Sequence, residues 1–209
     1  MAATAAADTT TFLSAANWYR PLDEPLTQIW FRGRANLAAV TAYLLANEGM
    51  SAAREIILSG GSAGATTVFT GADAFRALVP PAIKVVAAPD AGFFLDLPRA
   101  TNSSFFWYRD LFIAALPVWN ATASLSPGCL AAFPDAPHMC FLAQYNAPFI
   151  TVPLYLSNSA LDMWSLGNVL EVREDECRAL QRSRHGRFPH GLPQCALVQE
   201  LVCALTRKR

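Results

Sequence analysis

One serine in this sequence has the setting that nucleophilic catalysis requires. Residues 60–64 are Gly-Gly-Ser-Ala-Gly, a G-x-S-x-G match in which Ser62 follows a short apolar run and precedes a segment with helical spacing. In a sharp turn from strand to helix, the hydroxyl of Ser62 would project above the sheet edge, and the N–H of Ala63 would point to where an oxyanion forms. We therefore expect Ser62 to be a nucleophile and Ala63 to supply an oxyanion donor. The alternative is a plain tight turn or an anion-binding loop, although the lysine of a nucleotide P-loop is missing.

A serine nucleophile needs a base, and the base needs a carboxylate that orients it. Asp162 is the first candidate for this acid, because it follows the apolar run at 152–157 and comes after Ser62, as the order serine, acid, histidine requires. Asp90 and Asp96 are rivals near the end of another apolar run. Asp90 precedes Ala-Gly, which also predicts a turn in which the aspartate side chain bonds its own backbone.

The sequence leaves the general base open. Of the three histidines, His138 precedes Asp162 in the chain, whereas His185 and His190 follow it. The two later histidines fit the chain order of a triad, but both lie in stretches rich in Arg, Pro and Gly, where a histidine is more often solvated than catalytic. His185 and His190 are the candidates for the base, and the triad is not complete on the sequence alone.

Strands that alternate with helices must position these groups. Helical spacing predicts helices over 34–47 and 63–78, and short apolar runs predict buried strands over 55–59, 84–88 and 152–157. The expected core face of the first helix consists of Leu37, Val40, Leu44 and Leu45. This alternation predicts an α/β fold with a mostly parallel sheet and flanking helices, organised as a single domain over 1–209.

Composition narrows the class of protein. Hydrophobic residues make up 53% of the chain and charged residues 15%, which supplies a core and excludes a disordered chain. Sixteen basic residues balance sixteen acidic ones, which argues against a nucleic-acid partner. The longest uncharged run, 111–134, is broken by prolines and a glycine, so no membrane span is expected. The first thirty residues lack the positive region of a signal peptide and allow no assignment, and a last helix is expected from Gln194.

The cysteines all lie in the C-terminal half of the chain, at positions 129, 140, 177, 195 and 203. Cys129 with Cys140, and Cys177 with Cys195, enclose loops rich in Pro, Gly and polar residues that a disulfide could close; reduced, buried thiols are the alternative. No pair has the two-residue spacing of a zinc site, and no metal or cofactor is expected.

Two sequons for N-glycosylation begin at Asn102 and Asn120. They fit an extracellular protein, although such triplets also occur by chance.

Several motifs occur in a fixed order: IILSGGSAG at 56–64, PDAGFFLD at 89–96, CFLAQ at 140–144, TVPL at 151–154 and SNSALDMW at 157–164. Together with FRG at 31–33 and GM at 49–50, they resemble the pectin acetylesterase/Notum family of serine carboxylesterases over residues 30–170. The stretch from Asp90 to Asp96 is closer to the plant-type pectin acetylesterases than to Notum.

The resemblance implies an α/β-hydrolase fold with Ser62 as the nucleophile and Asp162 as the triad acid. It also implies a disulfide between Cys129 and Cys140, and a second between Cys177 and Cys195. No metal or cofactor is implied.

Two motifs of that family have no match in this chain: the Gly-Gly-Gly-Trp oxyanion loop and the Ser-Cys-x-x-His segment that carries the catalytic histidine. The elbow also departs from the family pattern, which has Cys or Ser at the place of Gly61 and Gly-Gly at the place of Gly64-Ala65. We expect from these departures an incomplete fold, as in a fragment or a shortened form, with weak or no activity.

The function expected from the resemblance is hydrolysis of acetyl esters on pectin or a related polysaccharide by a secreted or cell-wall enzyme. One alternative is a non-catalytic module that binds a glycan or a protein, in which the aromatic run at 105–108 could stack on sugars. A Notum-like hydrolase of lipid (palmitoleoyl) esters is the alternative within the family. No feature of the sequence sets an oligomeric state.

Overall fold

Two parallel strands lead the chain into the turn at Ser62. The computed structural model describes residues 31–100, 102–159 and 162–171. Within these ranges, β1 (Glu55–Gly61) pairs in parallel with β2 (Lys84–Asp90). Both strands form from the predicted apolar runs, and each continues two residues beyond the predicted end.

A third segment extends the sheet beside β2. Parallel bridges join Ala87 to Leu154 and Asp90 to Ser157, and backbone N–H groups of the two segments alternate as donors over 2.8 to 3.1 Å. The predicted strand over 152–157 therefore runs parallel to β2, and the order along the sheet is β1, β2, then this segment. The carboxyl ends of all three meet at one edge, next to Ser62.

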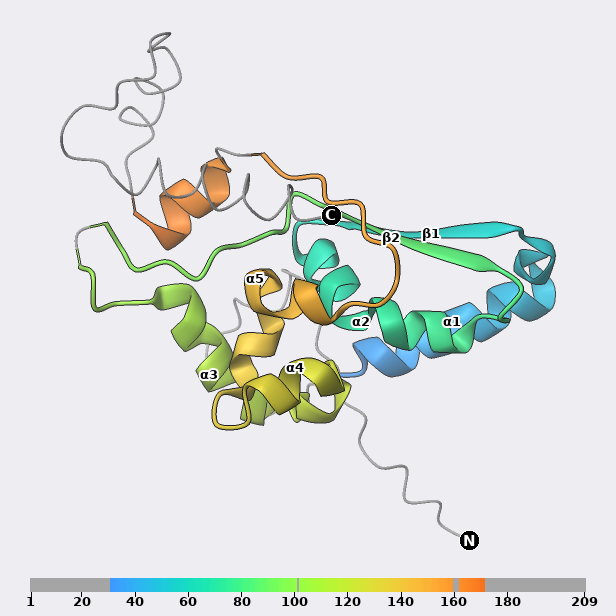
Figure 1. Cartoon of the computed structure of the whole chain (residues 1–209), viewed down its shortest axis with the longest axis horizontal. Helices are drawn as coiled ribbons and strands as arrows, with labels where there is room; N and C mark the ends of the chain where they lie inside the picture. Colours follow the sequence, from blue (N-terminus) through green and yellow to red (C-terminus); the bar gives the residue numbers. More distant parts are fainter. Residues whose placement is uncertain (1–30, 101, 160–161, 172–209) are drawn as a thin grey trace, which may run out of the picture.

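Helices and short helical turns connect the strands. The helices are α1 (Gly33–Asn47), α2 (Ala63–Leu78), α3 (Trp107–Trp119), α4 (Pro127–Ala132) and α5 (Ala143–Asn146). The turns are η2 (Met50–Ala52), η3 (Thr122–Ser124), η4 (Pro137–Phe141), η5 (Ala147–Phe149) and the π-helical η6 (Ser165–Val169). In Figure 1 the labelled helices lie on one side of the strands. No helix within the described ranges is both long and apolar enough to cross a bilayer.

Helix α2 is the element that anchors the sheet. It covers the predicted range and ends at Leu78. Pro80 accounts for this end, because proline disfavours helical backbone at the residue before it, and Val79 is extended. Its buried face, which includes Val68, Phe69 and Phe75, packs against both strands in the main hydrophobic core. The alternation of buried and accessible residues along β2 fits a sheet with one face against this helix.

Two predicted burial patterns are wrong in detail. β1 was expected to be buried, but its residues alternate, and Ile57 is 69% exposed because it points to the face of the sheet away from α2. On α1, Val40 was expected in the core face but is 55% exposed, whereas Thr41 is buried. Thr41 can be buried because its hydroxyl donates to the carbonyl of Leu37 at 2.7 Å, within the helix itself.

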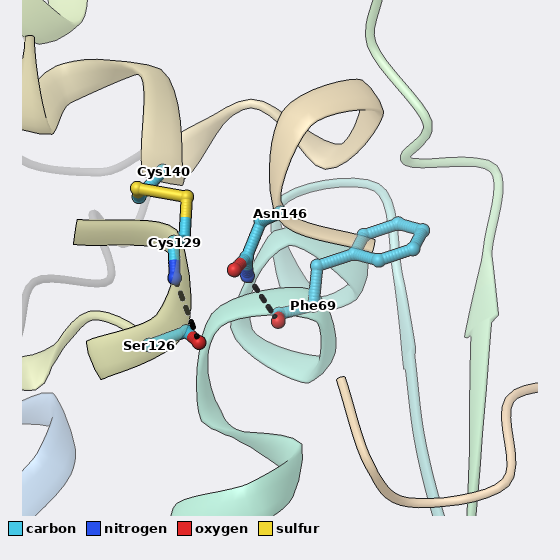
Figure 2. Close-up of a disulfide and its surroundings, with 5 residues drawn as sticks. All are labelled: Phe69, Ser126, Cys129, Cys140 and Asn146. Carbon is cyan, nitrogen blue, oxygen red and sulfur yellow. Dashed lines mark hydrogen bonds between the residues drawn. A yellow bond between two sulfur atoms is a disulfide. The ribbon is translucent and has the colours of Figure 1, made fainter. Parts of the chain in front are cut away.

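A second, aromatic core lies around α3 and is closed by a disulfide. Cys129 on α4 and Cys140 on η4 are bonded, and both are fully buried. Figure 2 shows the disulfide close to Asn146, whose side-chain NH₂ donates to the carbonyl of Phe69 at 2.7 Å. This buried hydrogen bond ties α5 to α2, and so joins the aromatic region to the main core.

The predicted pair Cys177 and Cys195, and the predicted helix from Gln194, lie outside the described residues. The extent of a single domain over 1–209 stays a prediction.

Candidate active site

The turn at Ser62 has the backbone of a nucleophile elbow. Ser62 has φ 55° and ψ −119°, a conformation that costs a non-glycine residue energy and that clusters at functional sites. Its N–H donates to the carbonyl of Asp90 at 3.0 Å, so the ladder between β1 and β2 continues into the turn. The Ser62 side chain is exposed at the carboxyl edge of the sheet.

Two glycines make this turn possible. A Cβ on Gly60 would lie 2.5 Å from the carbonyl oxygen of Gly64, and a Cβ on Gly92 would lie 2.6 Å from that of Ser62. Gly61 and Gly64, in contrast, have open space around the Cβ position. The tight packing therefore requires glycine at position 60, two residues before the serine, and at position 92 in the neighbouring loop.

The first turn of α2 presents donors beside the serine. The carbonyl of Ser62 accepts from the N–H of Ala65 at 2.9 Å, which closes the first helical turn. The N–H of Ala63 has no partner within the helix, as at every helix N-terminus, and Ala63 is exposed. This N–H and the positive end of the helix dipole are suited to stabilise an oxyanion.

Asp90 lies closest to the elbow in the sheet. It is opposite Gly61 in the register, is exposed, and accepts a hydrogen bond from the hydroxyl of Ser157 at 2.7 Å. The two residues place a carboxylate and a hydroxyl at the same edge as Ser62.

Asp96 is occupied by a structural network. Its side chain is fully buried. The single N–H at Nε of Arg109 is shared by both oxygens of Asp96, at 2.9 and 3.1 Å, and Nη2 of Arg109 also donates to Oδ2. The hydroxyl of Tyr145 donates to Oδ2 at 2.8 Å. Burial, followed by the hydrogen bond to Asp96, raises the pKa of the Tyr145 hydroxyl. A carboxylate that is held in this way orients loops and is not available to a histidine at Ser62.

Asp162 begins the turn after the third parallel segment. Its Oδ1 accepts from the N–H of Trp164 at 3.2 Å, and its Oδ2 accepts from the N–H of Ser165 at 3.1 Å and from the Ser165 hydroxyl. A carboxylate has about four acceptor positions, so Oδ1 retains capacity for an imidazole N–H. Asp162 is half-buried.

Asn158 belongs to the site, although the sequence did not single it out. Its Oδ1 accepts from the N–H of Phe93 at 3.0 Å and so holds the loop that places Gly92 against Ser62. The available signal was its place, directly after the expected strand over 152–157, where parallel sheets present polar groups.

No base is in contact with the serine within the described residues. His138 lies on η4 and makes no hydrogen bond to Ser62 or Asp162; burial, and next the charge of Arg109, lower its pKa. His185 and His190 lie outside the described residues. The described residues contain no cluster of His, Cys, Asp and Glu that could hold a metal ion.

A strand leads into a strained serine and a helix, a second parallel strand ends at Asp90, and Asp162 follows a third parallel segment. This arrangement is that of an α/β-hydrolase-like protein. A family model described as Pectinacetylesterase matches residues 9–200, and the chain belongs to that family of carboxylesterases.

The similar proteins include two from Arabidopsis thaliana. Pectin acetylesterase 7 is 34% identical over 146 residues, and pectin acetylesterase 11 is 33% identical over 147 residues. Each alignment covers 70% of this chain and 36% of the relative, so the chain spans about a third of the length of these relatives.

Among solved structures, the Wnt deacylase Notum from Drosophila superposes with a TM-score of 0.66 at 19% identity, over 85% of this chain and 48% of that one. This similarity confirms the α/β-hydrolase-like fold.

Proposed function

We propose that this chain carries the nucleophile and acid of a serine esterase that removes acetyl groups from an acetylated polysaccharide such as pectin. The observation that carries the proposal is the elbow itself: Ser62 is strained, exposed and at the N-terminus of α2. Membership of the family supports the ester-hydrolase class, and the names of the two plant relatives support the pectin substrate.

In the proposed reaction, Oγ of Ser62 attacks the acetyl carbonyl while a histidine takes its proton. The Ala63 N–H stabilises the tetrahedral oxyanion, and Asp162 orients the imidazole and stabilises its charged form. Collapse of the intermediate breaks the bond to the sugar oxygen, which takes the proton from the histidine and leaves as a hydroxyl. Water then hydrolyses the acetyl-serine by the same route and releases acetate. His185 and His190 are the candidates for the base within this chain.

The test is covalent labelling with a fluorophosphonate, followed by intact-mass measurement. Such a probe reacts with a serine that a nearby base activates. If His185 or His190 supplies the base, one adduct per chain forms, and the Ser62→Ala variant lacks it. A folded chain that takes no label would contradict esterase activity of this chain and favour a non-catalytic binding module.

Two matched variants identify the acid. Asp162→Asn should slow labelling strongly, because loss of the triad acid costs about 10⁴-fold in a serine hydrolase. Asp90→Asn should leave the labelling rate close to that of the unmodified chain. The reverse result would assign the role of the acid to Asp90.

We further propose an extracellular or cell-wall location. The Cys129–Cys140 disulfide is of the kind that persists in oxidising surroundings, and both sequon asparagines, Asn102 and Asn120, are exposed.

A further inference from the structure

We propose that Trp164, supported by Trp107, is a platform on which a sugar ring of the substrate stacks beside Ser62. This inference rests on the proposed function and names the part of the substrate that the site holds. It assigns a binding role to two side chains that take no part in the proton transfers.

Trp164 is the most accessible member of an aromatic cluster. Its ring centroid lies 4.6 Å from that of Phe94, 5.9 Å from that of Tyr108 and 6.2 Å from that of Trp107. Phe94 and Tyr108 are only 6% and 7% exposed, whereas Trp164 is 40% exposed, and Trp107 is half-buried. The buried rings therefore hold the indole of Trp164 from one side and leave part of it open.

Two short structural paths lead from this cluster to the serine. Phe94 follows Gly92 by two residues, and Gly92 packs against the carbonyl of Ser62. Tyr108 interacts with the side chain of Thr66, whose N–H approaches the same carbonyl at 3.4 Å.

Trp164 itself comes two residues after Asp162, and its own N–H donates to that carboxylate at 3.2 Å. The indole thus belongs to the same turn as the proposed acid.

A rigid, partly open indole suits a pyranose ring. Tryptophan offers a large flat face and a polar N–H at a low cost in side-chain entropy, and aromatic walls with a few polar groups are typical of ligand sites. An acetyl ester is bonded directly to a ring hydroxyl, so when its carbonyl lies at Ser62 the sugar ring must lie within a few bonds of the same place. An open aromatic face on the turn that carries the proposed acid can hold that ring, whereas a long acyl chain requires an enclosed tunnel.

The experiment measures binding in a background that cannot turn over the substrate. Ser62→Ala is titrated with an acetylated oligogalacturonide by calorimetry, alone and combined with Trp164→Ala. We expect Trp164→Ala to weaken binding about tenfold, which corresponds to about 1.4 kcal/mol. Tyr43→Ala is the matched control, because Tyr43 is an aromatic residue on α1 that is 57% exposed, and its removal should leave the affinity unchanged.

A second variant covers the case in which Trp164→Ala does not fold. Trp164→Phe keeps an aromatic contact with Phe94 while reducing the stacking face, and it should weaken binding about threefold, or about 0.6 kcal/mol. A circular-dichroism melt checks folding of each variant. Unchanged affinity in a folded Trp164 variant would overturn the platform.

Other outcomes of these measurements also test the platform. If the oligosaccharide does not bind at millimolar concentration, the proposal is overturned. If a free long-chain fatty acid displaces the bound oligosaccharide, the proposal is also overturned, and an acyl-chain site is favoured. Fluorophosphonate labelling is measured separately from binding. If Ser62 is labelled but binding does not depend on Trp164, the esterase proposal is kept and the sugar platform is rejected. If binding depends on Trp164 but Ser62 is not labelled, the sugar-binding site is kept and the proposed catalytic function of this chain is rejected.

Discussion

At the scale of single residues, Gly92 is a sharp test of the elbow. Alanine at this position would place its Cβ 2.3 Å from Cβ of Ala65 and 2.6 Å from the carbonyl oxygen of Ser62, and neither neighbour has a side chain that can swing away. We expect Gly92→Ala to lower the free energy of unfolding by about 1–3 kcal/mol, as overpacking does. It should also slow fluorophosphonate labelling. Urea denaturation measures the first effect.

Gly64→Ala is the control for this substitution. Gly64 lies in the first turn of α2 with open space at its Cβ position, and alanine favours helix by up to about 1 kcal/mol over glycine. The two glycine variants should therefore change stability in opposite directions. Equal stability of Gly92→Ala and the parent chain would contradict the close approach.

The ion pair of Asp96 gives a second prediction at this scale. Asp96→Asn leaves the charge of Arg109 without its partner, and the removal of one member of a buried pair costs about 3–5 kcal/mol. The Arg109 side chain is 30% exposed, so water partly solvates its charge when Asp96 is replaced. We therefore expect a loss at the lower end of that range, about 3 kcal/mol, in the free energy of unfolding.

The surface pair of Lys84 and Glu55 is the comparison for Asp96. Its N–O distance is 2.7 Å, but both side chains are more than 60% exposed. Glu55→Gln should cost less than about 1 kcal/mol, and less still in high salt. If both substitutions cost the same, the burial of Asp96 is not what stabilises its pair.

At the scale of elements, the disulfide fixes α4 to η4. Cys129 and Cys140 are 11 residues apart, and closing a loop of about this size contributes about 3 kcal/mol by restricting the unfolded chain. We expect the Cys129→Ala/Cys140→Ala variant to lose about 2–3 kcal/mol in urea denaturation. Reduction of the parent chain should cause at least the same loss.

Thiol counting on the denatured, non-reduced chain completes this test. If the predicted Cys177–Cys195 pair also forms, the only free thiol of the parent chain is Cys203. The double variant should then still respond to reducing agent. Three alkylated cysteines in the parent chain would show that the second disulfide does not form, and five would show that neither disulfide forms.

The sequence predicted the elements of this site better than their burial. Periodicity located α2 and both strands, since the 3.6-residue and two-residue spacings arise from contacts that each element makes on its own face. It did not predict that Ile57 is exposed, because an apolar run is equally compatible with a strand covered on one face or on two. Asn158 was missed for a related reason: its partner is the N–H of Phe93, 65 residues away, and no local pattern encodes such a contact.

At the scale of the whole molecule, both N-glycosylation sequons are accessible on the surface. Asn102 and Asn120 are exposed, on a loop and at the end of α3 respectively. In a eukaryotic secretory host we expect the chain to carry N-glycans, which a peptide N-glycosidase removes with a measurable fall in mass.

The matched variants for this prediction spare the asparagines. Asn120 adopts a left-handed backbone with φ 47°, which asparagine tolerates better than most residues, so its replacement would combine glycan loss with strain. Thr122→Ala and Ser104→Ala each destroy one sequon and keep the backbone, and each should remove one glycan from the intact mass. If the glycosidase does not change the mass of the secreted chain, the sequons no longer support an extracellular location. The Cys129–Cys140 disulfide would then be the remaining structural support for it.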